Sequence, residues 1–298
     1  MRVLLTGGSG FIGRNLSRHL ITEGHTVFCL CRESSIFDFH HTNLHRVPIR
    51  DYSEIATKME EIRPDGVIHL ATRFESAHAP EHITDLIYSN IEYGAYLIEA
   101  ACRYQVPWFL NTGTFWQHYE GACYLPVNFY AATKQAFEDI ARYYYSLGKI
   151  LFVTLCLNDT YGPGDTRRKI FNLWKKISKT GETLAMSPGE QIMDMIYIDD
   201  VVSAFLLLCT RLETGQVKNN GKIYYLSARE KYSLRELAQL FETVSGKKLP
   251  IIWGKLPYRP RETMYPRCYG EPLPDWNQKV NFQEGIQYFL RGKNGRKS

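Results

Sequence analysis

Tyr130 and Lys134 stand four residues apart in the segment YAATK, near the start of an expected helix. Because four residues make about one helical turn, the phenol and the ammonium are expected on the same face of that helix. Free tyrosine has a pKa of about 10, and a nearby ammonium favours the phenolate. The pair therefore predicts a phenol that can exchange a proton near neutral pH.

Hydroxyl groups earlier in the chain strengthen this interpretation. Thr112 and Thr114 directly follow an apolar segment that is expected to be a strand. Since parallel sheets bind ligands at the carboxyl ends of their strands, these hydroxyls are expected beside the phenol. Tyr145 and Lys149 have the same spacing, but a glycine interrupts the helix between them, and we expect no chemistry there.

Residues 6–13 read TGGSGFIG and stand between an expected strand and an expected helix. Gly7 permits a tight turn, and Gly10 lets a pyrophosphate approach the N-terminus of the helix. Gly13 lets the helix pack closely on the strand. This context predicts a dinucleotide-binding loop, with cofactor contacts at Gly7, Gly10, Phe11 and Ile12.

The end of the second expected strand bears on which dinucleotide binds. NAD-selective folds of this kind keep an acidic residue there for the ribose 2′-hydroxyl, whereas this chain has Cys31 followed by Arg32. A guanidinium can pair with a 2′-phosphate through charge-assisted hydrogen bonds. We therefore predict NADP(H) rather than NAD, with Arg32 and Ser34 at the 2′-phosphate. The alternative is that Arg32 is only a solvated loop residue.

Alternating strand and helix signals position these segments. The alternation predicts an α/β fold, a doubly wound parallel sheet of the Rossmann type. The expected strands are 3–6, 26–30, 44–49, 66–70, 108–111, 151–157 and 222–227. The expected helices are 12–23, 53–63, 82–104, 129–147 and 198–212.

Glycine and proline become frequent after Tyr161, which predicts a smaller, loop-rich C-terminal lobe that binds the substrate. We expect the NADP-binding domain to comprise residues 1–160 together with about 196–227. The lobe would then comprise residues 161–195 and 228–298.

Composition narrows the class of protein. The 298 residues are 44% hydrophobic and 22% charged, which is typical of a folded globular chain. The net charge of +5 suits an anionic small substrate such as a sugar diphosphate. Lysines and arginines form no stripe interleaved with aromatic residues, so we expect no nucleic-acid partner. No run of about 18 apolar residues exists, so we expect no membrane span.

The seven cysteines are odd in number and form no Cys-x-x-Cys pair, which is typical of reduced thiols in a cytoplasmic protein. The first expected strand begins so near the N-terminus that we expect no signal peptide. A metal site is not expected, because His40, His41 and His45 have no carboxylate or cysteine to complete a zinc pattern.

These motifs together resemble the extended short-chain dehydrogenase/reductase family, whose members are nucleotide-sugar epimerases, dehydratases and reductases. The resemblance rests on the glycine loop, the threonine that ends the fifth expected strand, the YAATK segment and the segment YGPGD at 161–165. Asn90 and the segments 68–71, 197–200 and 258–260 match further landmarks of the family. The match covers essentially the whole chain.

The resemblance implies a role for each member of the constellation. Tyr130 would be the acid/base, Lys134 would tune it and hold the nicotinamide ribose, and Thr112 would orient the substrate oxygen. Further cofactor contacts are implied at Ile49, Arg50, Leu70, Ala71 and Asn90. The helices at 82–104 and 129–147 would form the bundle of a homodimer.

Departures from the family pattern bear on the reaction. Its 4,6-dehydratases carry an Asp-Glu pair after the catalytic Ser/Thr, whereas Gly113 and Thr114 stand here and cannot do acid/base work at a C–H bond. Several members hold the diphosphate with an arginine where this chain has Met193. We expect that role to fall to Arg259, Arg261, Arg167 or Lys169.

The segments NTGTFWQHY at 111–119 and DTYGPGD at 159–165 resemble one sub-branch, the 4-keto reductases that complete deoxysugar nucleotides. These include CDP-abequose and CDP-paratose synthases and dTDP-4-keto-6-deoxyhexose reductases. The resemblance implies reduction of a CDP- or dTDP-linked sugar by NADPH, with the proton from Tyr130. The implied substrate contacts are Thr114, Trp116, Gln117, His118, Asp159, Arg167, Lys169 and Arg259. The alternative is that Trp116 is core packing and His118 is a satisfied loop histidine.

Two other functions stay open at this point. A nucleotide-sugar 4-epimerase would hold NAD tightly, and Arg32 argues against it. A non-catalytic NAD(P)-binding sensor would be expected to lack Tyr130 or Lys134, and this chain keeps both.

Overall fold

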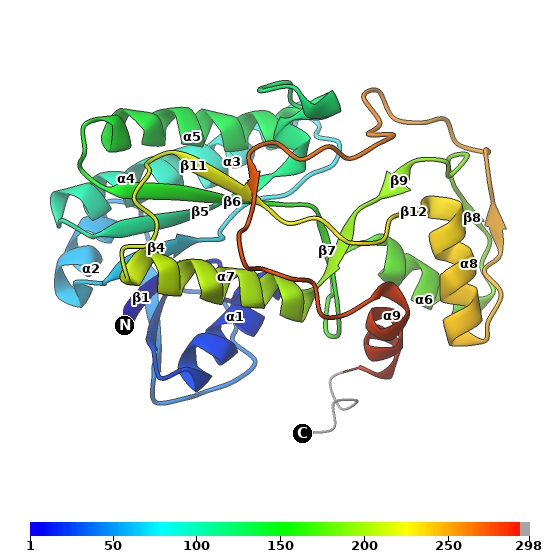
Figure 1. Ribbon diagram of the computed structural model, residues 1–298, viewed down its shortest axis with the longest axis horizontal. Helices are drawn as coiled ribbons and strands as arrows, with labels where there is room; N and C mark the ends of the chain where they lie inside the picture. The colour runs from blue at the N-terminus through cyan, green and yellow to red at the C-terminus, as the bar shows by residue number, and fades with distance from the viewer. Residues whose placement is uncertain (293–298) are drawn as a thin grey trace.

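An eight-stranded sheet forms the centre of the molecule, and helices cover both of its faces (Figure 1). This computed structural model describes residues 1–292. The strand order is β14-β11-β6-β5-β4-β1-β2-β3, with every neighbouring pair parallel, which confirms the predicted doubly wound α/β class. The strands are β1 (Arg2–Thr6), β2 (Thr26–Arg32), β3 (Leu44–Ile49), β4 (Gly66–His69), β5 (Trp108–Thr114), β6 (Leu151–Leu157), β11 (Lys222–Tyr225) and β14 (Glu271–Pro272).

Each face of the sheet has its own hydrophobic core. On one face α1 packs against α7, and Leu16 and Phe205 are fully buried there. On the other face α4 packs against both α2 and α5, and Met59, Leu97 and Phe137 are buried. Since the central strands are covered on both sides, their sequences are nearly continuous apolar runs. The helices are α1 (Phe11–Thr22), α2 (Glu54–Ile62), α4 (Tyr93–Arg103), α5 (Phe129–Ser146) and α7 (Ile198–Glu213).

The single helix predicted over 82–104 is interrupted. It consists of a 3-10 turn (Pro80–His82), α3 (Ile83–Ile87), a π-helical turn (Tyr88–Glu92) and α4. Asn90 is buried in the π turn, where its Oδ1 accepts from the Arg73 amide at 2.7 Å and the Thr72 hydroxyl at 3.0 Å. The wide turn thus ties the helix to the loop that follows β4.

The C-terminal lobe is more regular than its glycine and proline content predicted. It contains α6 (Ile170–Thr180), α8 (Leu234–Ser245) and α9 (Phe282–Arg291). The Phe171 ring packs against those of Phe241 and Phe289, which joins the three helices. β8 (Leu184–Ala185) pairs with β13 (Ile251–Ile252), and β9 (Ile192–Met193) with β12 (Tyr232–Ser233). The prolines lie between these elements, where they interrupt no helical hydrogen bond.

Residues 228–298 do not belong wholly to the lobe, contrary to prediction. β14 lies beside β11 and forms the edge of the main sheet. Pro272 occurs there because an edge strand tolerates a missing amide donor. β7 (Asp159–Tyr161) and β10 (Met195–Tyr197) pair in parallel where the chain enters and leaves the lobe. Residues 293–298, also predicted to belong to the lobe, lie outside the described residues.

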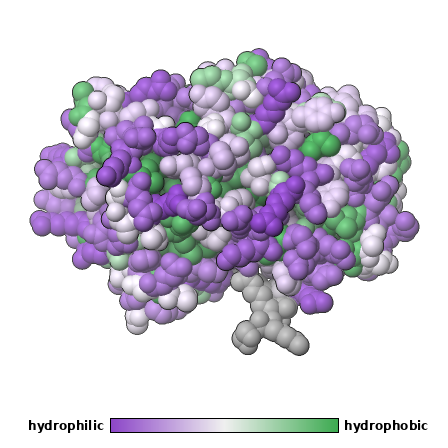
Figure 2. Space-filling view, viewed as in Figure 1, coloured by the Kyte–Doolittle hydropathy of each residue, from purple (hydrophilic) through white to green (hydrophobic). Residues whose placement is uncertain are grey.

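Hydrophilic residues predominate on the face shown in Figure 2, where hydrophobic residues form separate small patches. No helix within residues 1–292 is long and apolar enough to cross a bilayer. In the same range, no three or more His, Cys, Asp or Glu side chains are arranged to hold a metal ion. The seven cysteines are all free thiols.

Candidate active site

The strand order reverses between β1 and β4, and the loops that follow these two strands meet at that point. Gly7 turns the chain after β1 with a φ of +71°, and a Cβ there would lie 2.8 Å from the Ala71 amide nitrogen. A Cβ on Gly13 would lie 2.2 Å from the Gly7 carbonyl oxygen. The turn and the close packing predicted for these two glycines are therefore confirmed.

A cavity of about 250 Å³ opens at this edge of the sheet, and we call it the glycine-loop cavity. α1 begins at Gly10 with no side-chain cap and no acidic residue in its first turn, which suits a bound phosphate. The predicted residues on its walls are Gly7, Gly10, Phe11, Ile12, Leu70, Thr112, Thr114, Trp116, Tyr130, Asp159, Arg167 and Lys169. Glycines beside a helix N-terminus, facing hydroxyl groups, form a wall that fits a dinucleotide.

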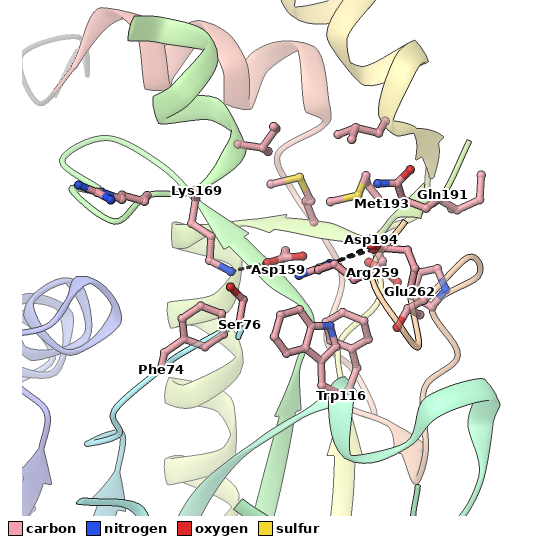
Figure 3. Close-up of a pocket in the computed structure, with 18 residues that line it drawn as sticks. Phe74, Ser76, Trp116, Asp159, Lys169, Gln191, Met193, Asp194, Arg259 and Glu262 are labelled. Atoms are coloured by element: carbon pink, nitrogen blue, oxygen red, sulfur yellow. Dashed lines mark hydrogen bonds and ion pairs between the residues drawn. The ribbon is translucent and has the colours of Figure 1, made fainter. Parts of the chain in front are cut away.

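A second cavity of about 280 Å³ adjoins the first, and we call it the interlobe cavity (Figure 3). The two cavities share a wall made of Phe74, Phe115, Trp116, Asp159 and Lys169. The lobe contributes polar and charged residues to the far side, among them Gln191, Asp194, Arg259, Glu262 and Thr263.

Tyr130 stands in the first turn of α5, where the Asn128 side chain caps the helix at 2.9 Å. The phenol is buried, and the Phe74 ring lies edge-on at 5.0 Å between centroids. Burial raises the pKa of Tyr130 to about 12, against the lowering effects of a hydrogen bond with Thr72 and the charge of Arg167. Burial thus opposes the expected shift toward phenolate and favours the protonated phenol.

Lys134 lies one turn further along α5 and is also buried, behind the wall of the glycine-loop cavity. Burial lowers the pKa of its ammonium, and the charge of Glu138 opposes that shift. Lys134 thus places a titratable cation one helical turn behind the phenol.

Thr112 and Thr114 occupy the end of β5, as predicted. The Thr112 Oγ1 is buried and has no hydrogen-bond partner within the described chain, although the residue lines the glycine-loop cavity. Buried hydroxyls normally have a partner, so this atom fits a group bound in the cavity. The Thr114 hydroxyl accepts from the Trp116 amide at 3.4 Å and begins a 3-10 turn.

That turn directs Gln117 and His118 away from both cavities, so the prediction that they contact the substrate is wrong. The Gln117 Oε1 accepts from the Thr114 amide at 2.9 Å. The His118 ring stacks on Tyr269 at 4.4 Å between centroids, and its Nδ1 lies 2.8 Å from a backbone carbonyl oxygen. Protein groups therefore satisfy both side chains.

Asp159 and Lys169 face each other in the interlobe cavity, with 2.7 Å between Oδ1 and the ammonium nitrogen (Figure 3). The Arg259 guanidinium packs over Trp116 at 5.5 Å from the ring centroid. Two hydrogen bonds of 3.0 and 2.9 Å join it to Glu262. The structure thus brings four of the predicted substrate contacts together in one cavity.

Arg167 and Arg261 lie elsewhere. The Arg167 guanidinium packs over Phe11 at 4.7 Å, inside the glycine-loop cavity, and Asp165 holds it through two hydrogen bonds of 2.8 Å. Arg261 donates to the carbonyl oxygen of Pro126 and lines neither cavity. Of the four cations expected to replace the missing arginine, only two therefore line the interlobe cavity.

The predicted 2′-phosphate corner lies where β2 and β3 end. Arg32 and Ile49 are register partners there, and Arg50 follows directly. The Arg50 guanidinium donates to Glu33 at 2.9 Å, whereas Arg32 and Ser34 are exposed. Arg46 also donates to the Ser35 carbonyl oxygen there, at 2.9 Å. The corner thus holds three guanidinium groups, and it holds the Glu33 carboxylate, which the sequence interpretation did not include.

Asn90 and Ala71 line neither cavity and bind the loop after β4, so their contact with a cofactor stays a prediction. The Asn90 Nδ2 donates to the Thr133 hydroxyl at 2.9 Å and to the Arg73 carbonyl oxygen at 3.0 Å. The Ala71 amide donates to the Thr6 hydroxyl at 3.1 Å. Both residues therefore fix the loop after β4.

Several site residues were missed from the sequence. Thr72 follows the end of β4, and the strand-end rule that selected Thr112 could have found it. Glu138 stands four residues after Lys134, so one more helical turn of the same spacing could have found it. Gln191 carries no such signal, because only the fold of the lobe brings it to the cavity.

Comparison with known proteins agrees with this geometry. The sequence profile described as the NAD dependent epimerase/dehydratase family matches residues 3–224. The chain is 28% identical over 298 residues to the CDP-abequose synthase of Salmonella typhimurium, with 97% of each protein covered.

Solved structures show the same fold. The UDP-glucose 4-epimerase of Thermotoga maritima with UDP-glucose has a TM-score of 0.84 at 21% identity, over 98% of each chain. The UDP-glucuronic acid 4-epimerase of Bacillus cereus, in complex with UDP-glucuronic acid and NAD, has a TM-score of 0.84 at 20% identity, also over 98% of each chain.

The separation of Arg167 from Arg259 predicts separate binding defects. Arg167→Gln should weaken binding of a nicotinamide dinucleotide and spare binding of a nucleoside diphosphate, and Arg259→Gln should do the reverse. Loss of a charge-assisted hydrogen bond costs about 1.5–3 kcal/mol, or roughly 10- to 100-fold in affinity. Calorimetric titration of each variant with each ligand measures the effect, and equal losses for both ligands would contradict the division into two cavities.

Proposed function

The chain belongs to the NAD dependent epimerase/dehydratase family, and from that membership we propose that it is an NADPH-dependent reductase of a nucleotide-linked 4-keto-(di)deoxyhexose. The nucleotide is CDP or dTDP. One observation carries the proposal. The wall of the glycine-loop cavity contains the Tyr130 phenol and the Thr112 hydroxyl, which has no hydrogen-bond partner within the described chain. Gly113 stands in the same wall at a position where a dehydratase needs an acidic residue. Similarity to a CDP-abequose synthase over nearly the full length supports it.

Reduction of a ketone needs little from the protein beyond a proton and correct orientation. Gly7 and Gly10 would hold the pyrophosphate of NADPH, and the bound cofactor would supply a hydride for C4 of the sugar. Tyr130 donates its phenolic proton to the carbonyl oxygen, which becomes the new hydroxyl, and Thr112 donates a hydrogen bond to that oxygen. Lys134, one turn behind, stabilises the phenolate until solvent returns the proton, and by resemblance it also holds the nicotinamide ribose.

The protonated phenol of Tyr130 is the form from which a reduction starts. A reductase uses Tyr130 first as an acid, and burial keeps the phenol protonated because it raises the pKa to about 12. An epimerase with tightly bound NAD must begin by removing a proton from a hydroxyl, which requires the phenolate. The buried phenol is thus ready for the first proton transfer of the proposed reduction.

The 2′-phosphate corner favours NADP(H) in this proposal. Arg32 is exposed at the end of β2, and Arg50 lies on the neighbouring strand end, so two guanidinium groups can reach an anion there. Glu33 neutralises only one of them, since its carboxylate engages Arg50.

We also propose a homodimer of a cytoplasmic protein. Apolar side chains protrude from α3, α4, the π turn and α5, which are the helices that the resemblance assigns to a dimer bundle. They are Ile87, Tyr88, Tyr96, Tyr143 and Leu147, each at least 41% exposed. A protein–protein contact through these helices would cover side chains that otherwise face water.

Tyr130→Phe should abolish reduction and leave NADPH binding nearly unchanged. Without the phenol the developing alkoxide receives no proton, which costs about 10²–10⁴-fold in rate. Single-turnover oxidation of NADPH with a CDP-linked 4-keto-6-deoxyhexose measures the loss. Tyr145→Phe is the control, because the Tyr145 hydroxyl contacts Arg142 and not Lys149. Full activity in Tyr130→Phe, or an equal loss in the control, would refute the proposed site.

Arg32→Glu should reverse the cofactor preference. The new carboxylate would repel the 2′-phosphate and accept hydrogen bonds from a 2′-hydroxyl, so NADPH should bind at least about tenfold more weakly while NADH is spared. Fluorescence titration with both cofactors measures this. If the unmodified protein binds NADH as tightly as NADPH, the proposal of NADP specificity fails.

Tyr96→Glu should convert the dimer to a monomer. A buried, unpaired carboxylate in an apolar contact is costly, so the sedimentation mass should fall to that of one chain. Tyr265→Glu is the control, since Tyr265 is 69% exposed but lies in the lobe. A monomeric unmodified protein, or dissociation by the control alone, would contradict the proposed contact.

A further inference from the structure

Three aromatic side chains belong to the wall that the two cavities share, and the proposed reaction gives them no role. Phe74 stands on the loop after β4, and Phe115 and Trp116 stand in the 3-10 turn after β5. The Phe74 ring lies 5.6 Å from that of Trp116 between centroids, and the Trp116 ring lies 5.9 Å from that of Phe115. We call these three side chains the aromatic wall.

The aromatic wall stands between the phenol and the cations of the interlobe cavity. Tyr130 lines only the glycine-loop cavity, and its ring lies edge-on to Phe74 at 5.0 Å between centroids. The Lys169 ammonium lies over the Phe74 ring at 4.7 Å, and the Arg259 guanidinium lies over Trp116 at 5.5 Å (Figure 3). Any molecule that reaches from the phenol to both cations must therefore pass along the aromatic wall.

A sugar nucleotide has the shape to do so. Its diphosphate is bonded to C1 of the sugar, whereas the carbonyl group of the proposed substrate is at C4, on the opposite side of the six-membered ring. With the diphosphate at Lys169 and Arg259 and the carbonyl oxygen at Tyr130, the sugar ring itself lies against the aromatic wall. In taking a sugar nucleotide as the ligand, the inference rests on the proposed function.

Aromatic rings are unfavourable neighbours for sugar hydroxyls that point at them. C3 and C5 flank C4, so the group on one of these two carbons comes next to Phe74 when C4 is at the phenol. The rings offer a hydroxyl no hydrogen-bond partner, and a hydroxyl that loses water without gaining a partner costs free energy. Asp159 and Lys169, which are polar members of the shared wall, already bind each other at 2.7 Å. A hydrogen atom or a methyl group at the same place loses no hydrogen bond.

Phe74 is an open aromatic ring and not a core residue. It is 43% exposed, and it belongs to neither of the hydrophobic cores that cover the two faces of the sheet. A methyl group or a C–H face laid against this ring removes apolar surface from water on both partners, which is favourable. Since the cores do not depend on Phe74, variants at this position should fold.

We propose that the aromatic wall selects a sugar that is deoxygenated on the side of C4 that faces it, and that Phe74 is the main specificity-determining residue. The wall contributes contact alone and supplies no acid or base. The preference for a deoxy sugar over its hydroxylated counterpart should be about tenfold in affinity and not above about 100-fold, because an apolar site rejects an added hydroxyl only weakly.

Calorimetric titration with unreactive sugar nucleotides tests this selection without catalysis. The probes are the glucose, 3-deoxyglucose and 6-deoxyglucose derivatives of CDP and of dTDP, without cofactor. In the nucleotide series that binds more tightly, one of the two deoxy sugars should bind about tenfold more tightly than the glucose derivative. If neither deoxy sugar binds more tightly than glucose, the inference is overturned.

Variants of Phe74 show whether this ring causes the preference. Phe74→Gln offers an amide to a sugar hydroxyl, so the preference should fall to about twofold or less. Phe74→Leu stays apolar and should keep it. Tyr124→Gln is the control, because Tyr124 is 49% exposed and lines neither cavity. A full preference in Phe74→Gln, or its loss in the control, would contradict the role of Phe74.

These measurements separate the two proposals. The preference is a ratio of two affinities, so a general loss of nucleotide binding in a variant cancels from it. If the preference is found and depends on Phe74 but no 4-keto sugar is reduced, the proposed reaction fails and the role of the aromatic wall stands. If 4-keto sugars are reduced but the unmodified protein shows no preference, only the role of the aromatic wall fails.

Discussion

The close contact between the glycine loop and the end of β4 is the constraint on which the rest of the site depends. Gly7 has no room for a side chain against Ala71, and the Thr6 hydroxyl joins the two strands by contacting both the Ala71 amide and the His69 ring. This contact holds the loop after β4 in place. Thr72 can then reach Tyr130 on α5, and the same loop forms one wall of both cavities.

Burial along one face of α5 determines what that face can do chemically. Tyr130, Lys134 and Glu138 follow one another at successive turns, and the interior that packs them also excludes the water that would stabilise their charges. Burial therefore favours the protonated form of the phenol. A site of this kind suits a reaction that delivers a proton to a developing alkoxide.

The order of the sheet was predictable because buried parallel strands and amphipathic helices leave strong patterns in the sequence. The YAATK spacing and the strand-end threonines located one wall of the glycine-loop cavity. The π turn at Asn90 left no such signal, since an extra residue in one turn hardly changes the apolar periodicity. β14 was missed because an edge strand needs few apolar residues.

Side-chain direction was the least predictable feature. Gln117 and His118 stand within six residues of Thr112 in sequence, but one 3-10 turn faces them into the protein. Arg167 was expected at the substrate, but Asp165 and the Phe11 ring hold it beside the glycine loop. The direction of such a side chain depends on contacts between segments far apart in the chain. One sequence does not reveal these contacts.

The most direct test of the central claim follows the hydride. The protein is mixed with NADPH carrying deuterium at C4 of the nicotinamide and with CDP- or dTDP-linked 4-keto-6-deoxyhexose, and the products are examined by mass spectrometry and NMR. A reductase oxidises one NADPH for each sugar consumed and places deuterium at C4 of the sugar. Interconversion of 4-hydroxyl epimers with NAD, without net consumption of NADPH, would contradict the account.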